Sequence, residues 1–171
     1  MKWQEVGEQP CSVARALSVV GDRWTMLILR SAFMGIRRFD DFQASLGVTR
    51  HLLSDRLKRL VEEDVLKKVA YQDRQQRFEY RLTDKGRDLY PVLLTLVRWG
   101  DKWMDQGLGA PLDYIHQSCG KKFTPVLVCS ECHEEVTARN VMPTLGVGFQ
   151  ASVLQANSKA SSPTPLDLKE A

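Results

Sequence analysis

One stretch decides how the rest of the chain is interpreted, and it reads Val48-Thr-Arg-His-Leu-Leu-Ser-Asp-Arg-Leu-Lys-Arg-Leu-Val-Glu-Glu-Asp-Val65. Its apolar residues recur at helical spacing and form one stripe: Leu53, Leu57, Leu60 and Val61. Thr49 stands at an N-cap position, where its hydroxyl can accept a hydrogen bond from an unpaired N–H of the first turn. The opposite side of this helix is polar and basic, with His51, Asp55, Lys58 and Arg59 at its centre and Ser54 and Arg56 on its flanks. A helix held on one side that presents donors and positive charge on the other suits reading of the DNA major groove. An ordinary basic surface helix has the same pattern.

The residues before this helix predict three shorter helices. These cover about residues 11–20, 23–34 and 37–46, with Asp22 as the N-cap of the second. In the third, Phe39, Phe42 and Leu46 are spaced for one apolar face, and Gly47 makes a tight turn. A short helix, a glycine turn and a longer basic helix in succession indicate a helix-turn-helix.

The residues after Val65 predict a β-hairpin. Residues 66–72 are rich in β-forming residues, and residues 77–82 alternate between apolar and charged side chains. A hairpin directly after a helix-turn-helix is a wing. Its predicted tip carries Arg74, Gln75 and Gln76, which suit contact with phosphate or the minor groove. The expected fold is therefore mainly α with a small β-hairpin wing.

A long helix is predicted from Thr83 to about Gln106. Its apolar face is wider than a small winged domain needs to cover, and it contains Leu89, Val92, Leu93, Leu96, Trp99, Trp103 and Met104. We expect the surplus to form a dimer interface, because paired reading helices match two DNA half-sites one helical turn apart. The alternative is that the whole face packs on its own domain.

Composition constrains the class of protein and its compartment. The 171 residues are 43% hydrophobic with a net charge of only +3, but basic residues concentrate between Arg50 and Arg81, as in a phosphate-binding surface. The first ten residues contain no apolar run, and no stretch is long and apolar enough to span a membrane. We therefore expect a cytoplasmic protein. Its four cysteines are then metal ligands, reactive thiols or core residues rather than structural disulfides.

Residues 112–145 form a compositionally distinct extension after a hinge at Gly107 to Pro111. The extension holds two pairs of candidate ligands: His116 with Cys119, and Cys129 with Cys132. Two residues lie within each pair and nine between the pairs, which predicts a zinc-ribbon-like site for one zinc ion per chain. His133 is an alternative ligand, and a redox dithiol of Cys129 and Cys132 or metal-free turns are competing interpretations. The Ser- and Pro-rich residues 146–171 are expected to be disordered.

The order of motifs resembles HxlR-type bacterial winged-helix transcription regulators. The resemblance covers about residues 11–105 and rests on five blocks: Cys11-Ser-Val-Ala-Arg-Ala-Leu-Ser-Val-Val-Gly-Asp-Arg-Trp-Thr-Met-Leu-Ile-Leu-Arg30, Arg37-Arg-Phe-Asp-Asp-Phe42, Leu53-Ser-Asp-Arg-Leu-Lys-Arg-Leu60, Glu79-Tyr-Arg-Leu-Thr-Asp-Lys-Gly86 and residues 91–100. It implies a dimeric DNA-binding repressor or activator with residues 1–107 as the DNA-binding and dimerisation domain. Dimers of similar proteins form through the N-terminal and long C-terminal helices. Several such proteins respond to electrophiles or oxidants through a cysteine at the position of Cys11.

The resemblance also implies roles for individual residues. It places Thr49, Arg50, His51 and Ser54 where the reading helix enters the groove, Arg38 and Arg56 at phosphate contacts, and Arg74 and Arg77 on the wing. Lys58 joins the phosphate contacts because of its charge and its place on the same helix. Ser12 departs from the proline usual after the sensor cysteine. Cys11 begins a helix, where the dipole favours the thiolate, although a buried structural thiol is the alternative.

The predicted function is a homodimeric, sequence-specific DNA-binding transcription regulator, and not an enzyme. Its expected partners are double-stranded DNA, a second copy of the chain, and a small electrophile or oxidant as signal, with no membrane. Two alternatives stay open. One is a thiol redox protein using Cys129 and Cys132, although no thioredoxin-like βαβ pattern surrounds them. The other is a winged-helix module that binds proteins instead of DNA.

Overall fold

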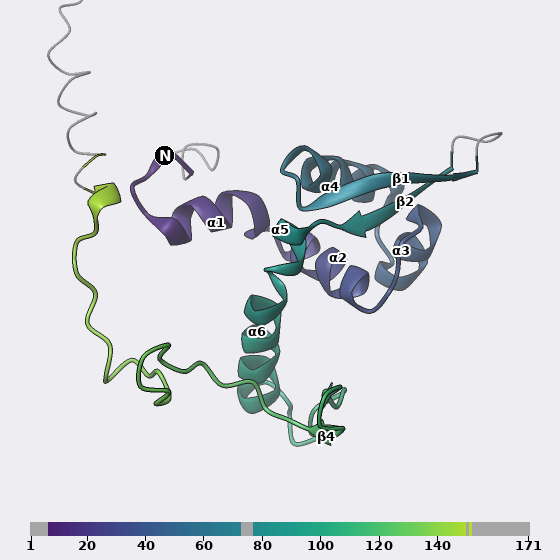
Figure 1. The fold of residues 1–171 in the computed structure, drawn as a ribbon. Helices are drawn as coiled ribbons and strands as arrows, with labels where there is room; N and C mark the ends of the chain where they lie inside the picture. Colours follow the sequence, from purple (N-terminus) through teal and green to yellow (C-terminus); the bar gives the residue numbers. More distant parts are fainter. Residues whose placement is uncertain (1–6, 73–76, 150, 152–171) are drawn as a thin grey trace, which may run out of the picture. The chain divides into compact units, whose positions relative to one another are not determined.

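The computed structural model describes residues 7–72, 77–149 and 151 (Figure 1). Contacts divide the chain into two units, residues 19–135 and residues 1–18 with 136–171. The elements are α1 (Ser12–Val20), α2 (Arg23–Phe33), α3 (Phe39–Leu46), α4 (Arg50–Glu62), β1 (Leu66–Gln72), β2 (Arg77–Leu82), α5 (Asp84–Arg87), α6 (Tyr90–Trp103), β3 (Ile115–His116) and β4 (Lys121–Lys122). The predicted wing-tip residues Arg74, Gln75 and Gln76, and nearly all of the tail predicted to be disordered, lie outside the described residues.

The leucine stripe of α4 lies at the centre of the core, as the sequence predicts. Leu53, Leu57 and Leu60 are at most 1% exposed. They belong to a buried cluster with Val20, Ile28, Leu29, Phe42, Val48, Val65 and Leu66. Thr49 caps α4, because its hydroxyl accepts a hydrogen bond from the N–H of Leu52 at 3.4 Å. The turn before it uses Gly47 in the left-handed conformation, with φ of 64°, which glycine adopts without steric cost.

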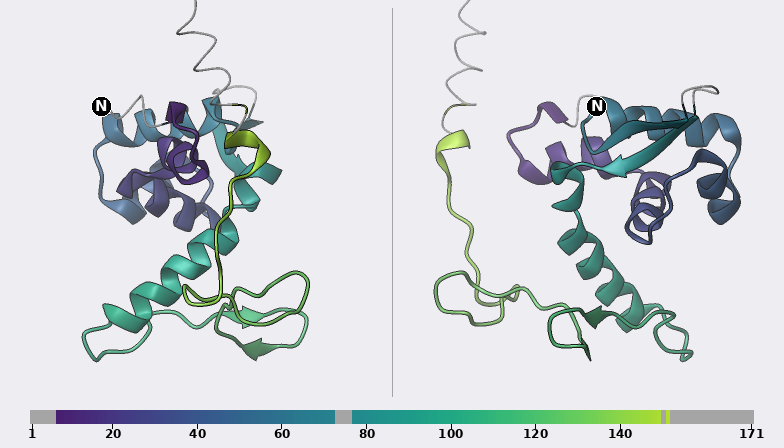
Figure 2. Two further views of the ribbon diagram at one scale, coloured as in Figure 1. Left: turned by 90° about the vertical axis from the view of Figure 1, so that its left-hand side faces the viewer. Right: turned by 45° about the vertical axis from the view of Figure 1, so that its right-hand side comes forward.

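The predicted wing forms at the expected residues. β1 and β2 are antiparallel, pairing from Leu66 with Leu82 outward to Gln72 with Arg77, with an irregularity between Ala70 and Gln72. β1 packs on α4, while β2 packs on α2 and α3 (Figure 2). A further backbone hydrogen bond of 2.8 Å runs from the N–H of Tyr80 to the carbonyl of Arg37. The base of the wing is therefore tied to the segment that leads into α3.

The prediction of one long helix from Thr83 to about Gln106 is wrong, because this segment forms two helices. α5 ends at Arg87 and α6 begins at Tyr90, with Pro91 in the first turn of α6. Proline has no N–H to donate and is tolerated at the start of a helix but not in its interior, so the break falls here. α5 lies against the end of the core, where a Cβ on Gly86 would be only 2.2 Å from the carbonyl oxygen of Val65. The break lets α6 leave the winged domain at its own angle.

The extension is organised as two small hairpins. β3 and β4 pair Ile115 with Lys122 and His116 with Lys121, and Val128 makes an antiparallel bridge with Glu135. Arg98 of α6 holds this region through the carbonyl of Pro125 at 3.2 Å and the carboxylate of Glu135 at 3.3 Å. No residue from 113 to 135 is buried. Among the described residues, no helix is long and apolar enough to cross a membrane.

Candidate nucleic-acid interface

The outer face of α4 presents most of the residues predicted to read DNA. Thr49, Arg50, His51, Ser54 and Lys58 are all exposed. These residues are exposed because burial of the leucine stripe on one side of α4 leaves the opposite side in solvent. The side chain of His51 is 89% exposed and that of Lys58 is 73% exposed, so both can reach a ligand without rearrangement of the core.

Each charged side chain on this face already has a partner in the chain. The Arg50 guanidinium donates to the Asp40 carboxylate at 2.9 Å and to the Gln43 side-chain oxygen at 3.0 Å, and it lies 4.8 Å from the centre of the Phe39 ring. Within α4, His51 lies 3.3 Å from Asp55, and Lys58 lies 3.7 Å from Glu62. Exposed ion pairs of this kind contribute only about 0–1 kcal/mol, so a phosphate or a base edge can replace the protein partner at low cost.

Arg56 differs from these residues because it is half-buried in a contact within the domain. Its Nε donates to Asp22 Oδ1 at 2.9 Å, and its side chain is 29% exposed. The same carboxylate caps α2 by accepting from the N–H groups of Trp24 and Thr25 at 3.0 and 3.2 Å. One aspartate thus joins the start of α2 to the middle of α4.

These contacts change the ionisation of Asp22. Burial by itself would raise the pKa of Asp22, but the hydrogen bond and positive charge of Arg56, together with the N–H groups of Thr25 and Trp24, outweigh it. The net result is a pKa below the ordinary value for aspartate, so the carboxylate is charged in the folded protein at neutral pH.

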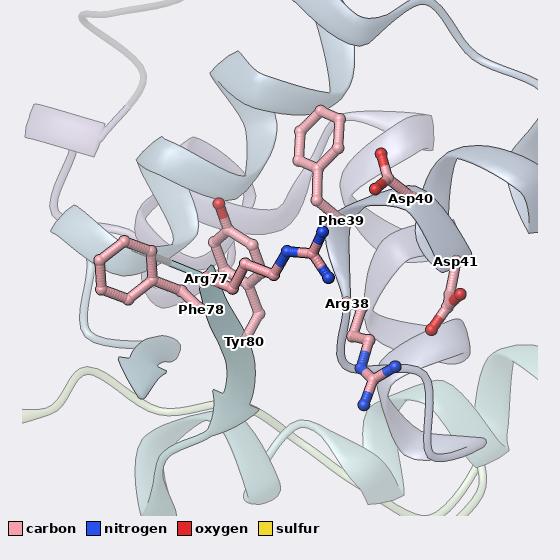
Figure 3. A pocket seen from close by; sticks show the side chains of 7 residues that line it. All are labelled: Arg38, Phe39, Asp40, Asp41, Arg77, Phe78 and Tyr80. Carbon is pink, nitrogen blue, oxygen red and sulfur yellow. The ribbon is translucent and has the colours of Figure 1, made fainter. Parts of the chain in front are cut away.

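Arg38 and Arg77 meet at a hollow between the wing and the start of α3. Figure 3 shows both side chains there, with Arg77 next to the ring of Tyr80. The hollow has a volume of about 440 Å³ and is also lined by Phe39, Asp40, Asp41 and Phe78. It brings together a predicted phosphate contact, Arg38, and a predicted wing arginine, Arg77, from segments far apart in sequence. Arg74, the other predicted wing arginine, lies outside the described residues.

The cysteines occupy two separate regions. Cys11 is exposed and directly precedes α1, with its carbonyl accepting from the N–H of Arg15 at 3.0 Å. In the extension, Cys119 Sγ lies 3.5 Å from His116 Nδ1. The pKa of Cys129 is lowered because the N–H groups of Cys132 and Glu131 donate to its sulfur. The two side chains within each predicted pair therefore lie close together, but in the described part of the chain no three His, Cys, Asp or Glu side chains are grouped closely enough to hold a metal ion.

Sequence reasoning missed the residues that hold the interface in place. Asp22 was predicted as a helix cap, but its contact with Arg56 joins residues 34 apart, and no local pattern reports such a pairing. Asp40, Gln43 and Phe39 were similarly not connected to Arg50. The available signal was that a short turn joins α3 to α4 in a helix-turn-helix, so that the start of α4 lies within reach of side chains of α3.

We expect substitutions of Asp22 to separate its two roles. Asp22→Ala removes both the cap and the ion pair and should lower the free energy of unfolding by about 1–2 kcal/mol at pH 7. Asp22→Asn keeps a good capping side chain but loses the charge facing Arg56, so it should cost less. Because the folded-state pKa is depressed, the charge contributes stability above the unfolded-state pKa and this contribution is lost as pH falls through the folded-state pKa.

Urea unfolding of the wild type and both variants between about pH 3 and pH 7 measures this. The advantage of the wild type over Asp22→Asn should shrink as the solution is acidified below about pH 4. An advantage that stays constant over this range would show that the ion pair does not stabilise the fold.

Comparison with known proteins agrees with this architecture. Residues 19–108, more than half of the chain, match the HxlR-like helix-turn-helix family. The HTH-type transcriptional regulator Rv3095 of Mycobacterium tuberculosis is 47% identical over 142 residues, which cover 83% of this chain and 90% of the relative. The HTH-type transcriptional regulator YvaP of Bacillus subtilis is 36% identical over 92 residues, covering 53% of this chain and 85% of the relative.

Solved structures give the same result. The crystal structure of PA1607, described as a candidate transcription factor, aligns with a TM-score of 0.74 at 34% identity, and the alignment covers 84% of this chain and 99% of PA1607. The redox regulator HypR in its reduced form aligns with a TM-score of 0.52 at 25% identity, covering 57% of this chain and 96% of its own. The chain is a transcription regulator that belongs to the HxlR-like helix-turn-helix family.

Proposed function

We propose that the chain acts as a homodimer that binds specific DNA sequences, with α4 in the major groove and the wing on the DNA backbone or in the minor groove. The observation that carries this proposal is the two-sided structure of α4. Its leucine stripe is buried, and the opposite face is exposed and rich in hydrogen-bond donors. A helix fixed in this way can be inserted into the major groove without changing the core.

The exposed residues divide into two proposed groups. Thr49 is the N-cap of α4, and Arg50, His51 and Ser54 lie on its first two turns, the part of a recognition helix that contacts base edges. Lys58 lies further along α4, while Arg38 and Arg77 come from the hollow beside the wing. Arginine and lysine in these outer positions neutralise phosphates and release counterions. In this proposal, the first group determines which DNA sequence is bound, and the second group supplies affinity for DNA of any sequence.

Arg56 was predicted as a phosphate contact, but its position supports a mainly structural role. Because its guanidinium is held by Asp22 and is only 29% exposed, it has less reach to DNA than Lys58 has. We assign it mainly to holding α4 on α2, so that the reading face keeps its angle to the wing.

The proposed dimer uses the apolar face that α6 leaves in solvent. Only Leu93 and Leu94 of this helix are buried, while Leu96, Trp99 and Trp103 are 50%, 57% and 64% exposed. These residues and Val92 follow one another at spacings of three and four and so form a stripe. On α1, Val13 and Leu17 are also exposed. A second copy of the chain is the occupant that fits, because DNA-reading helices act in pairs about 34–36 Å apart.

We further propose that Cys11 makes the protein responsive to oxidants or electrophiles. Its thiol is exposed and directly precedes α1, so a small reagent in solution can reach it. The likeness to HypR, which is titled a redox regulator, supports the same assignment. Modification of this thiol changes the region beside the exposed residues of α1 and so alters the dimer that binds DNA.

The two groups of DNA contacts predict different effects on binding. Lys58→Ala and Arg77→Ala should weaken binding to target and random DNA alike, and each should reduce the slope of log K against log salt by about 1. His51→Ala and Ser54→Ala should change the preferred sequence, with a loss of about 1–3 kcal/mol at the affected base pair and little effect on random DNA.

Fluorescence anisotropy with the protein's own promoter and a scrambled duplex, at several salt concentrations, provides both quantities. Arg139→Ala, which removes an exposed arginine outside α4, the wing and the α6 stripe, serves as the control and should bind as the wild type does. Equal losses on both duplexes for all four variants would contradict the division into two groups.

The dimer is tested by a charge in its proposed interface. Trp99→Glu should weaken self-association at least about 100-fold, because a carboxylate then replaces a large apolar side chain in the interface. Leu108→Glu is the matched control, since Leu108 is 89% exposed and lies beyond the stripe. Sedimentation velocity should give a monomer for the first variant and a dimer for the second. A dimer that persists in Trp99→Glu would place the interface elsewhere.

The sensor role of Cys11 predicts a clear difference between wild type and Cys11→Ser. A quinone or diamide should change the affinity of the wild type for promoter DNA, while the affinity of Cys11→Ser should stay the same because the reacting thiol is gone. The measurement is anisotropy before and after treatment, followed by a reductant to test reversal of the diamide effect. A variant that responds as the wild type does would exclude Cys11 as the sensor.

A further inference from the structure

The extension contains the same hairpin twice. Residues 115–122 read Ile-His-Gln-Ser-Cys-Gly-Lys-Lys, and residues 128–135 read Val-Cys-Ser-Glu-Cys-His-Glu-Glu. In the first, Ile115 pairs with Lys122, and in the second, Val128 pairs with Glu135. The two segments therefore share length and strand register as well as an apolar first residue. We call them the first and second knuckle.

The turns of the two knuckles have the same backbone geometry. In the first, the N–H of Gly120 donates to the carbonyl of His116 at 2.7 Å, and in the second, the N–H of His133 donates to the carbonyl of Cys129 at 3.0 Å. The donor residue is left-handed in both, with φ of 68° at Gly120 and 60° at His133. A non-glycine residue in this conformation is uncommon, so the second turn keeps its shape against the preference of its own sequence.

This equivalence gives each knuckle two side chains in matching positions. His116 corresponds to Cys129, and Cys119 corresponds to Cys132. In the first knuckle, His116 Nδ1 and Cys119 Sγ are 3.5 Å apart. Bonds of about 2.3 Å from zinc to sulfur and about 2.0–2.1 Å to nitrogen, at a tetrahedral angle, put the two donor atoms about 3.6 Å apart. The first pair is therefore already spaced as two ligands of one zinc ion.

The second pair also has the geometry of a ligand turn. The N–H groups of Cys132 and Glu131 point at the sulfur of Cys129, and the Cys132 side chain lies within hydrogen-bonding distance of it. His133 occupies the position of Gly120, which follows the last side chain of the turn. It therefore matches no ligand position of the first knuckle.

The lack of a core gives an independent reason for a metal. No residue from 113 to 135 is buried, and Val126, Leu127 and Val128 are 58%, 60% and 45% exposed. A segment of this size cannot hold a fixed structure by apolar burial alone and needs disulfides, a metal or a partner. The cysteines here are free, and a bond between Cys129 and Cys132 would close only a very short loop.

We propose that the two knuckles bind one Zn²⁺ ion through His116, Cys119, Cys129 and Cys132. Because the described structure holds the four side chains as two pairs, ligation of the second pair is the step that brings the knuckles together. The free energy of metal binding then serves as folding free energy for the extension. Three thiolates and a neutral imidazole around Zn²⁺ leave one negative charge, and Lys121, Lys122 and Arg98 are the nearby cations.

The two hairpins carry charges of opposite sign. Lys121 and Lys122 follow the first turn, and Glu134 and Glu135 stand at the same positions after the second. Arg98 already anchors both Pro125, between the knuckles, and Glu135, at the end of the second. The proposed site thus fixes the extension on α6, the helix whose exposed face we assign to the dimer.

The test begins with the full-length wild type purified without chelator from zinc-supplemented cells. Elemental analysis should find about one zinc per chain, and cobalt in its place should give the intense visible absorption of a tetrahedral thiolate site. Alkylation followed by peptide mass analysis should show Cys119, Cys129 and Cys132 protected until a chelator is added, with Cys11 labelled throughout. This measurement needs no variant, so it holds even if substitutions unfold the extension.

Variants then identify the ligands. Cys119→Ser, Cys129→Ser and His116→Ala should each weaken zinc binding at least about 100-fold, because a tetrahedral site loses one of four ligands. Cys11→Ser and His133→Gly are the matched controls and should keep one zinc, the second because glycine suits the left-handed turn. Wild-type protein that carries less than about 0.2 zinc per chain would overturn the proposal. A Cys129–Cys132 disulfide in such protein would indicate a redox dithiol instead.

Discussion

Burial of the α4 leucine stripe is the interaction on which the other features depend. Leu53, Leu57 and Leu60 fix the rotation of α4 about its own axis, because turning the helix would bring polar side chains into the core. That rotation determines which residues face outward. The same stripe holds α2 and α3 from one side and the base of the wing from the other. The fold therefore positions the proposed reading face and the proposed backbone contacts with a single set of apolar contacts.

Rotation alone does not fix the tilt of α4, and polar contacts at its start and its middle add that constraint. Asp22 joins the start of α2 to Arg56, while Asp40 and Gln43 of α3 hold Arg50. These two contacts differ in exposure. The Asp22 contact is half-buried and structural, whereas Arg50 is 68% exposed and bound to groups that a nucleic acid can replace. Arginines on one helix can thus have separate roles because of what stands opposite them.

The sequence predicted features that arise from local patterns. The four helices, the two wing strands and the Asp22 and Thr49 caps all follow from periodicity and capping preference, and the structure confirms them. The break near Pro91 could have been predicted, since proline favours the first turn of a helix, but the apolar spacing on both sides continues without a gap. The contacts of Arg56 with Asp22 and of Arg50 with α3 could not have been predicted, because they depend on how separate helices pack. The shared geometry of the two knuckles is also hidden in the sequence, where only the ligand spacing is visible.

The winged domain and the extension are stabilised in different ways. This difference affects how a chemical signal could change DNA binding. The winged domain has a core that is stable by apolar burial, so its reading face changes little unless the core unfolds. The extension has no buried residue from 113 to 135, so its order depends on groups that conditions can alter. It contacts α6 through Arg98, and α6 carries the proposed dimer stripe. In the proposed dimer, a change in the extension would therefore act first on the spacing of the two reading helices rather than on the shape of either one. Because two half-sites must be matched at once, a small change in that spacing is enough to weaken binding.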